Sequence, residues 1–274
     1  MRLKILENTK QISSAFDFAK DVHELGQKKN VPRGATSALW FRGQAKVGWE
    51  LKPSIGRTVQ EGGLYDPKKG SNDLYQTESA LLQRFKRDGY PFVQRVLTDW
   101  EAITLGQHHR LTTRLLDWTS NPLVALFFAA EEHPDADGAV FAYRPRKIWN
   151  YHISMFKGQN PKNSKVPKPL DVRGIKIVFP ILLADRLITQ SGGFTIQEPL
   201  RCLMKRNKEN FDRRRLDIFE IYKWTLPKKF KSKVLDELHR VSVNRRTLFP
   251  GLDGVGYGLW KQESFRQVKG MWIK

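Results

Sequence analysis

The feature that most constrains the fold is a stretch in the middle of the chain that is almost wholly apolar. Residues 122–130 read PLVALFFAA, and either Thr119 or Ser120 stands where it can cap a helix with Pro122 in its first turn. A helix without a polar face has to be covered on all sides. We therefore expect a helix here that lies buried in the core.

The rest of the chain mixes helical and strand patterns of uneven length. Further helices are expected at residues 15–26 with Ser13 or Ser14 as the cap, after Thr77, from the capping box at 98–101 toward Gln107, and around 231–243. Strands are expected at LWFR (39–42), GAVFAY (138–143), GIKIVFPI (174–181), GGFTIQ (192–197) and LDIFEIYKW (216–224). Because no internal repeat and no long Gly/Ser linker divides the chain, we expect a single α+β domain.

The charge of the chain is strongly positive and concentrated near its end. The formal net charge is +20, and residues 201–274 hold 19 Lys/Arg against 8 Asp/Glu. Such a surplus favours a polyanionic partner, most often nucleic acid, because neutralising phosphates releases counterions. The alternative is a basic surface without such a partner. The candidate nucleic-acid-binding residues are Arg213, Arg214, Arg215, Lys228 and Lys229.

The cysteine content and the absence of long apolar runs bear on the compartment in which the protein is expected. The single cysteine, Cys202, excludes an internal disulfide and an all-Cys zinc site. The first residues lack the apolar run of a signal peptide, and no stretch approaches the ~18 apolar residues of a membrane span. We expect a cytoplasmic protein without a membrane partner.

Polar residues gather directly before the apolar helix. The segment 107–121 reads QHHRLTTRLLDWTSN. The unpaired amides and the dipole of a helix N-terminus suit an anion such as a phosphate. The alternative is ordinary capping by Thr119, with Asp117 paired to Arg114. His108 and His109 are adjacent rather than at ligand spacing, so no metal is expected.

A second conspicuous stretch is LWFRGQ at residues 39–44, in which an arginine ends an apolar strand. A guanidinium in such a place is costly to desolvate unless it is paired. Arg42 is predicted to bind an anionic ligand, with Gly43 leaving backbone room for that ligand. A structural salt bridge to Asp117 or Glu78 is the alternative.

Together these stretches resemble the FRG-domain family of bacterial and phage proteins. The resemblance rests, in chain order, on WFRGQ (40–44), LKPSIGR (51–57), a Glu-led helix (78–87), QHHRLTTRLLDWTSNPLVALFFA (107–129), RLITQSGGFTI (186–196) and TLFPGLDG (247–254). Arg110, Leu111 and Thr112 stand where the family usually has Gly-Leu-Pro. The resemblance implies an FRG domain at 35–255, between an N-terminal helical segment (1–34) and a basic C-terminal tail (256–274).

The order of these parts is also similar, more distantly, to the ADP-ribosyltransferase superfamily. That similarity implies packed antiparallel sheets flanked by helices, with NAD as the substrate. Arg42 on the first core strand would hold a phosphate of NAD, and Arg114, Thr119 and Ser120 would line the same site. Either Trp118 or Phe194 would stack on the nicotinamide.

The same similarity places a catalytic glutamate where this chain has Gln190. A neutral amide can orient a ribose hydroxyl but cannot stabilise the positive charge that develops on the ribose. Glu198 or Asp117 would then supply the charge, and either His108 or His109 would deprotonate the attacking group.

Two functions follow as expectations. The first is an NAD-dependent ADP-ribosyltransferase toxin that modifies nucleic acid, RNA rather than DNA, in a toxin–antitoxin or anti-phage defence system with an antitoxin as protein partner. The second is a non-catalytic nucleic-acid-binding module of a defence protein. A third possibility, a nuclease, would need a clustered Asp/Glu metal site or a His pair at the scissile phosphate. Asp117 with His108 and His109 supports this function only weakly.

Overall fold

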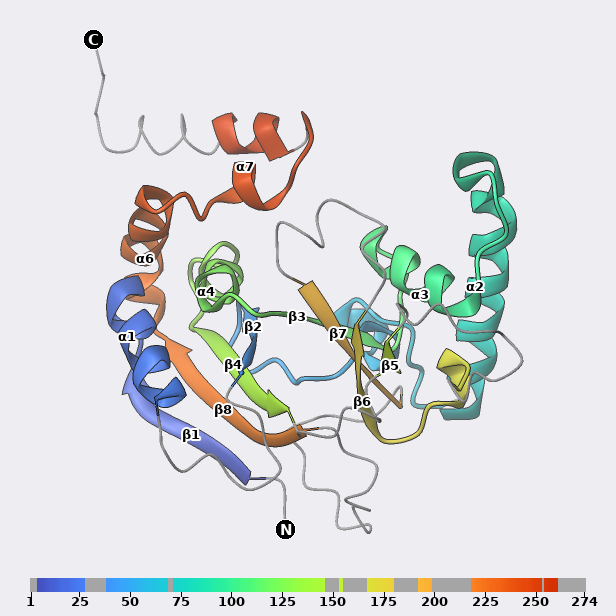
Figure 1. Ribbon diagram of the computed structural model, residues 1–274, viewed down its shortest axis with the longest axis horizontal. Coiled ribbons are helices and arrows are strands. Elements are labelled where there is room, and N and C mark those ends of the chain that lie inside the picture. The colour runs from blue at the N-terminus through green and yellow to red at the C-terminus, as the bar shows by residue number, and fades with distance from the viewer. Residues whose placement is uncertain are drawn as a thin grey trace.

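The fold is built around one mixed sheet flanked by helices (Figure 1). The computed structural model describes residues 4–27, 38–68, 71–145, 153–154, 167–179, 192–198, 218–252 and 254–260. The strands are β1 (Lys4–Gln11), β2 (Trp40–Gln44), β3 (Leu115–Thr119), β4 (Gly138–Pro145), β5 (Ile153–Ser154), β6 (Ile175–Phe179), β7 (Gly192–Gln197) and β8 (Ile218–Leu226). The helices are α1 (Ala15–Gly26), α2 (Ser71–Val93), α3 (Asp99–His108), α4 (Pro122–Ala130), α6 (Lys228–Arg240) and α7 (Arg245–Leu248), with short 3-10 turns at Ser54–Gly56, Val59–Glu61 and Pro169–Asp171. The predicted α+β class is confirmed.

The sheet consists of two halves that meet at a single residue pair. Its strand order is β1-β8-β4-β2-β3-β7-β6-β5, and only the two edge pairs, β1–β8 and β5–β6, are parallel. β2 pairs with β4 over five residues, and β3 pairs with β7 over five residues. Between β2 and β3, however, the only paired residues are Phe41 and Thr119. The β1-β8-β4-β2 half and the β3-β7-β6-β5 half therefore diverge on leaving this junction.

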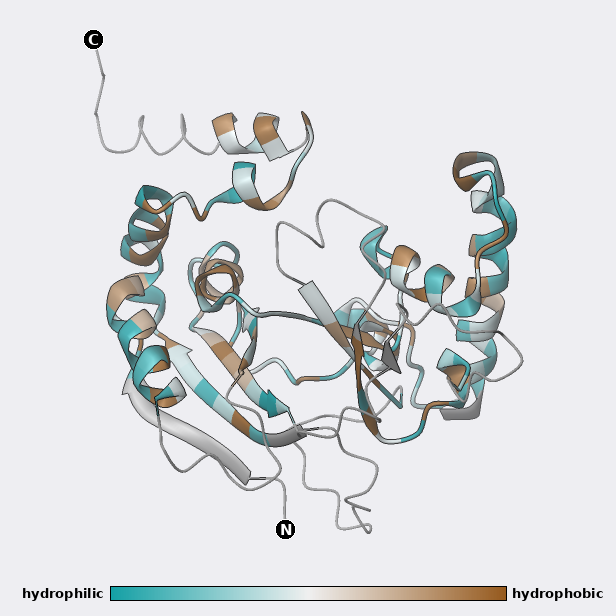
Figure 2. Cartoon of the chain, in the orientation of Figure 1, coloured by the Kyte–Doolittle hydropathy of each residue, from teal (hydrophilic) through white to brown (hydrophobic). Residues whose placement is uncertain are grey.

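Helix α4 lies buried against β2, as its composition predicts. Val124, Ala125 and Leu126 are almost fully buried, and Figure 2 shows the helix as one of the most hydrophobic parts of the chain. The contact is so close that a Cβ atom on Gly43 would lie 1.8 Å from the carbonyl oxygen of Ala125. The absent side chain thus makes room for α4. The prediction that Gly43 leaves room for a ligand is corrected accordingly.

Local signals predicted several boundaries and missed others. The caps by Ser14 and by the Thr98 capping box are confirmed. Helix α2 begins at Ser71, earlier than expected, and continues to Val93. β1 was not predicted, because its largely polar sequence becomes a strand only through parallel pairing with β8.

Among the helices described here, none has the length and apolar character that crossing a membrane requires.

Candidate binding cleft

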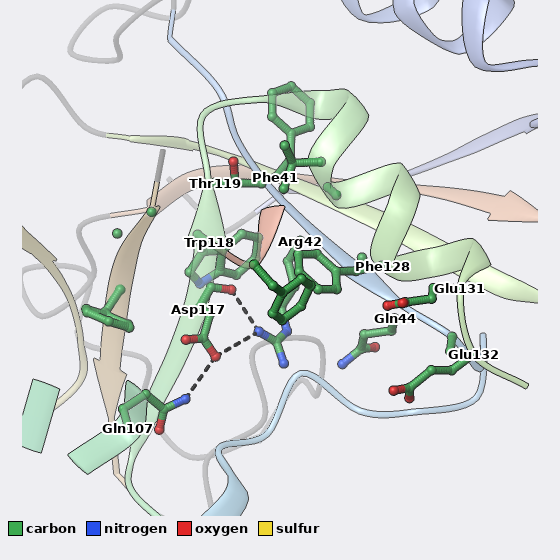
Figure 3. Close-up of a pocket in the computed structure, with 18 of the residues that line it drawn as sticks. Phe41, Arg42, Gln44, Gln107, Asp117, Trp118, Thr119, Phe128, Glu131 and Glu132 are labelled. Carbon is green, nitrogen blue, oxygen red and sulfur yellow. Dashed lines mark hydrogen bonds and ion pairs between the residues drawn. The ribbon is translucent and has the colours of Figure 1, made fainter. Parts of the chain in front are cut away.

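A cleft of about 670 Å³ opens where the two halves of the sheet diverge. Its walls come from β2, β3, β7, α3 and α4, from the loop that follows β2, and from the segment around α7. Figure 3 shows lining side chains from β2, β3, α3 and α4. Of the predicted site residues, the cleft brings together Arg42, Gly43, His108, Asp117, Trp118, Thr119 and Phe194. These residues are far apart in sequence, and the fold collects them at one place.

Arg42 points into this cleft from β2. Its Nη1 donates a hydrogen bond of 2.8 Å to the backbone oxygen of Asp117 and lies 3.6 Å from the Asp117 carboxylate oxygen Oδ2. Its Nε is buried and has no hydrogen-bond partner among the described residues. The predicted salt bridge to Asp117 is therefore present, yet the guanidinium keeps hydrogen-bonding capacity to spare.

A second guanidinium, that of Arg57, lines the same cleft. It is held in place because its Nε donates to the backbone oxygen of Lys52 at 3.2 Å, while its own carbonyl accepts from the amide of Tyr65 at 2.8 Å. Burial is the main cause that lowers the pKa of Arg42; Asp117 opposes this effect and the charge of Arg57 adds to it. Arg42 and Arg57 thus lie in one part of the cleft with the half-exposed carboxylate of Asp117, an arrangement that an anion would stabilise.

Arg57 was not predicted as a site residue. The signal that could have found it is its place at the end of LKPSIGR, one of the stretches that carry the family resemblance.

Asp117 is the centre of a polar network rather than a partner of Arg114. Its Oδ2 accepts a hydrogen bond of 2.8 Å from Gln107 Nε2, and Gln107 Oε1 accepts one of 2.6 Å from the Thr113 hydroxyl. The carboxylate is nevertheless 58% exposed. The network fixes the orientation of Asp117, and through it that of Arg42.

Arg114 lies outside the cleft, which corrects its assignment to the NAD site. Its side chain is 0% exposed and pairs with Glu78, itself 1% exposed, through Nη2 at 2.5 Å and Nε at 2.6 Å. Nη1 also faces the carbonyls of Pro169 and Leu170, both at 3.4 Å. Arg114 therefore anchors α2 to the start of β3. The expected alternative partner of Arg42, Glu78, is paired with Arg114 instead.

The two aromatic candidates form the inner wall of the cleft. Trp118 is 2% exposed, packs edge-on against Tyr143, and donates from its indole Nε1 to the hydroxyl of Thr195 at 2.9 Å. Phe194 is also buried and belongs to the core cluster that contains Leu115. Because both rings are packed inside the protein, the predicted stacking of either ring on a nicotinamide is corrected.

The backbone amides at the N-terminus of α4 donate their hydrogen bonds to groups of the chain itself. Asn121, and not Thr119 or Ser120, caps the helix: its side-chain oxygen accepts from the amides of Leu123 and Val124. The Thr119 hydroxyl accepts from the amide of Asn121, and Ser120 is exposed outside the cleft. With these amides occupied, the predicted anion site at the helix start is corrected, and the guanidinium pair takes its place.

The remaining predicted residues are distributed as follows. His108 lines the cleft and His109 does not, although their rings touch edge-on at a centroid distance of 4.9 Å. Glu198 lies outside the cleft and accepts a hydrogen bond from the amide of Gly174 at 3.3 Å. Lys228 and Lys229 are exposed at the start of α6. Gln190, Arg213, Arg214 and Arg215 lie outside the described residues.

No group of three or more His, Cys, Asp or Glu side chains is arranged to hold a metal ion in the part of the chain that the structure describes.

Acidic residues that the sequence did not single out line another part of the cleft. Glu131 and Glu132 follow the last residue of α4, and Glu131 is ion-paired with Arg245. The backbone oxygen of Glu132 accepts from Lys231 Nζ at 2.9 Å. The same ammonium donates to the carbonyls of Ala45 and His133 at 2.8 and 2.9 Å, so that it ties the end of β2 to the turn after α4.

This buried lysine supports a prediction about stability. We expect Lys231→Met to lower the free energy of unfolding by about 2–3 kcal/mol, because one buried and two partly buried carbonyls lose their charged donor. Urea unfolding followed by tryptophan fluorescence measures the change. Lys229→Met, at an exposed position on the same helix, is the matched control and should unfold at the wild-type midpoint. Equal midpoints for both variants would contradict the anchoring role.

Comparison with known families identifies part of the chain. Residues 37–138 match the family model of the FRG domain, a range that includes the Phe41-Arg42-Gly43 tripeptide and all of α2, α3, β3 and α4. The chain therefore contains an FRG domain, as the resemblance of its motifs predicted. Searches of curated proteins and of solved structures give no match.

Proposed function

We propose that the cleft binds NAD and that the protein transfers ADP-ribose from NAD to nucleic acid. The observation that carries this proposal is the pair of guanidiniums, Arg42 and Arg57, which line the cleft and both interact with the half-exposed carboxylate of Asp117. Arginine forks suit the oxygens of a diphosphate, and bidentate contacts from two arginines neutralise its two charges.

The architecture supports an ADP-ribosyltransferase-like reading of the fold. Arg42 stands on a core strand at the edge of the cleft, the place that the resemblance to that superfamily gives to the arginine that holds a phosphate of NAD. A volume of about 670 Å³ is within the range of cofactor-sized pockets.

In the proposed reaction, the bond between C1′ of the ribose and the pyridinium nitrogen breaks heterolytically. Both electrons remain on nitrogen, so nicotinamide leaves as a neutral molecule and the ribose becomes a cation. An oxygen or nitrogen of the acceptor then bonds to C1′ and gives up its proton. His108 is the histidine that lines the cleft, and it is assigned the role of accepting this proton.

The acceptor class rests on charge. A formal net charge of +20 favours a polyanion, and exposed lysines at the start of α6, Lys228 and Lys229, add to a basic surface outside the cleft. We assign RNA as the favoured acceptor over DNA. An enzyme that modifies the nucleic acid of its own cell acts as a toxin, which gives it a place in a defence system with an antitoxin partner.

The test is to incubate the purified protein with labelled NAD and separate RNA, DNA and protein fractions. We expect nicotinamide release and label in the RNA fraction. We expect Arg42→Ala and Arg57→Ala each to lower the affinity for ADP-ribose by about 10- to 100-fold, the loss typical of a charge-assisted hydrogen bond. Arg87→Ala is the matched control, because Arg87 is an exposed arginine paired with its neighbour Asp88 on α2.

The competing function gives a different result. If the wild-type protein binds RNA but releases no nicotinamide and transfers no label, the protein is a non-catalytic nucleic-acid-binding module. The Arg42–Asp117 pair is then purely structural, and Arg42→Ala alters thermal stability without altering RNA affinity.

A further inference from the structure

The charges that line the cleft are unevenly distributed. Arg42 and Arg57 interact with Asp117, whereas Glu131 and Glu132 come from the end of α4. Figure 3 shows the carboxylates of Glu131 and Glu132 on the same side of Arg42 as the Gln44 amide, with Asp117 on the other side. A ligand that spans the cleft therefore meets the guanidiniums of Arg42 and Arg57 at one part. At another part it meets the side chains of Gln44 and Glu132 beside the Glu131–Arg245 ion pair.

The carboxylates of the cleft differ in what already holds them. Asp117 is bound by Arg42 and Gln107, and Glu131 is ion-paired with Arg245, whose guanidinium packs over the rings of Phe249 and Tyr257. Glu132 is exposed and has no salt bridge within the described residues, while Lys231 fixes its backbone. Its carboxylate is thus the one available to a ligand.

The side chain of Gln44 independently indicates that a hydrogen-bond donor belongs here. It is 3% exposed and lines the cleft, and its Nε2 donates to the backbone oxygen of Glu50 at 3.3 Å, which sets the orientation of the amide. Its Oε1 is buried and accepts from no group that the structure describes. A buried acceptor without a partner destabilises the protein, and a hydroxyl or a water that enters from the cleft removes that penalty.

We infer that Gln44 and Glu132 form the subsite for the nicotinamide ribose of NAD. We further infer that Glu132 is the carboxylate that stabilises the cation formed on this ribose. This inference rests on the proposed function and names the group that replaces the glutamate expected at position 190. Ribose hydroxyls donate hydrogen bonds, which matches two acceptor side chains. A diphosphate does not donate at neutral pH, and so it belongs at the guanidiniums.

The chemical role follows from the charge that appears during the reaction. When the C1′–N bond breaks and its electron pair leaves with neutral nicotinamide, C1′ and the ring oxygen share one positive charge. A carboxylate beside the ribose stabilises this charge more than it stabilises the uncharged ribose of the ground state, which is the condition for lowering the barrier. The glutamine amide only accepts a hydroxyl hydrogen bond.

The test separates the ribose subsite from the phosphate subsite with two ligands, ADP and ADP-ribose, measured by isothermal titration calorimetry. We expect ADP-ribose to bind the wild-type protein more tightly than ADP does. Glu132→Ala should remove most of that difference and leave the dissociation constant of ADP within about twofold. Asp135→Asn, an exposed acidic residue outside the cleft, is the matched control and should retain both affinities.

A second variant tests the chemical role. Glu132→Gln keeps a hydrogen-bond acceptor of the same shape, so we expect ADP-ribose affinity to stay near the wild-type value. The kcat for nicotinamide release should fall about 100-fold with little change in KM, since only transition-state stabilisation is removed. A kcat that is unchanged in Glu132→Gln overturns the assignment of the charge to this residue.

The outcomes distinguish the two proposals. If the wild-type protein binds neither ADP nor ADP-ribose, the proposed function fails and the subsite fails with it. If ADP binds with dependence on Arg42 and Arg57, but Glu132→Ala affects both ligands equally or neither, the phosphate site stands and the ribose subsite is overturned.

Discussion

Gly43→Ala is expected to lower the free energy of unfolding by more than about 3 kcal/mol, beyond the usual cost of adding a methyl group to a packed core. The added Cβ would lie 1.8 Å from the carbonyl oxygen of Ala125 and 2.7 Å from the amide nitrogen of Ala129. Both atoms belong to the backbone of α4, so the overlap cannot be relieved by a side-chain rotation. The helix would have to move away from β2. Urea unfolding measures the loss.

Gly48→Ala is the control for this substitution, because a Cβ at Gly48 meets no atom within 4 Å. We expect its unfolding midpoint to equal that of the wild-type protein or to rise slightly, since alanine restricts the unfolded chain more than glycine does. If both variants unfold at the same denaturant concentration, the close approach of α4 and β2 is wrong. The cleft that depends on this approach would then need another description.

The helices that could be predicted are those whose signals lie within a few residues of one another. The cap at Ser14 and the capping box at Thr98 are local hydrogen-bonding patterns, and both are present. The burial of α4 follows from a composition that leaves no polar face. A short window of sequence contains all the information that these features need.

Features that depend on distant parts of the chain were missed or misassigned. β1 has a mostly polar sequence and becomes a strand through pairing with β8, more than 200 residues later. A pair between Asp117 and Arg114, three residues apart, is one expectation from the sequence. Asp117 lies in β3 and contacts Gln107, whereas Arg114 precedes the strand and pairs with Glu78 on α2.

In the candidate site, too, some residues could be predicted from local motifs and others could not. Arg42 and Asp117 were found by their motifs, and the structure brings them together. Arg57, Gln44 and Glu132 were not assigned. The first two lie in stretches that carry the family resemblance, but no pattern in the sequence gives any of the three a role of its own. Their role follows only from the way the loop after β2 and the end of α4 converge on one cleft.

The buried pair of Glu78 and Arg114 leads to the second large effect. We expect Glu78→Gln to lower the free energy of unfolding by about 3–5 kcal/mol, as is typical when one member of a buried ion pair loses its charge. The carboxylate accepts hydrogen bonds from both the backbone amide and the guanidinium of Arg114, at 3.0 and 2.6 Å. In the variant, an amide NH₂ group faces one of these donors, and the guanidinium remains buried without a counter-charge. Thermal and urea unfolding both measure the loss.

Asp88→Asn tests the same change of charge on the same helix at an exposed position, where Asp88 pairs with Arg87. Water solvates the remaining guanidinium there, so the unfolding midpoint should stay at the wild-type value.

The double variant Glu78→Leu/Arg114→Met removes both charges and should recover part of the stability lost in Glu78→Gln, because no unpaired charge is left in the core. A double variant less stable than Glu78→Gln would mean that the pair is needed for more than mutual neutralisation. The additional contribution would then come from the link that Arg114 makes between β3 and the carbonyls of Pro169 and Leu170.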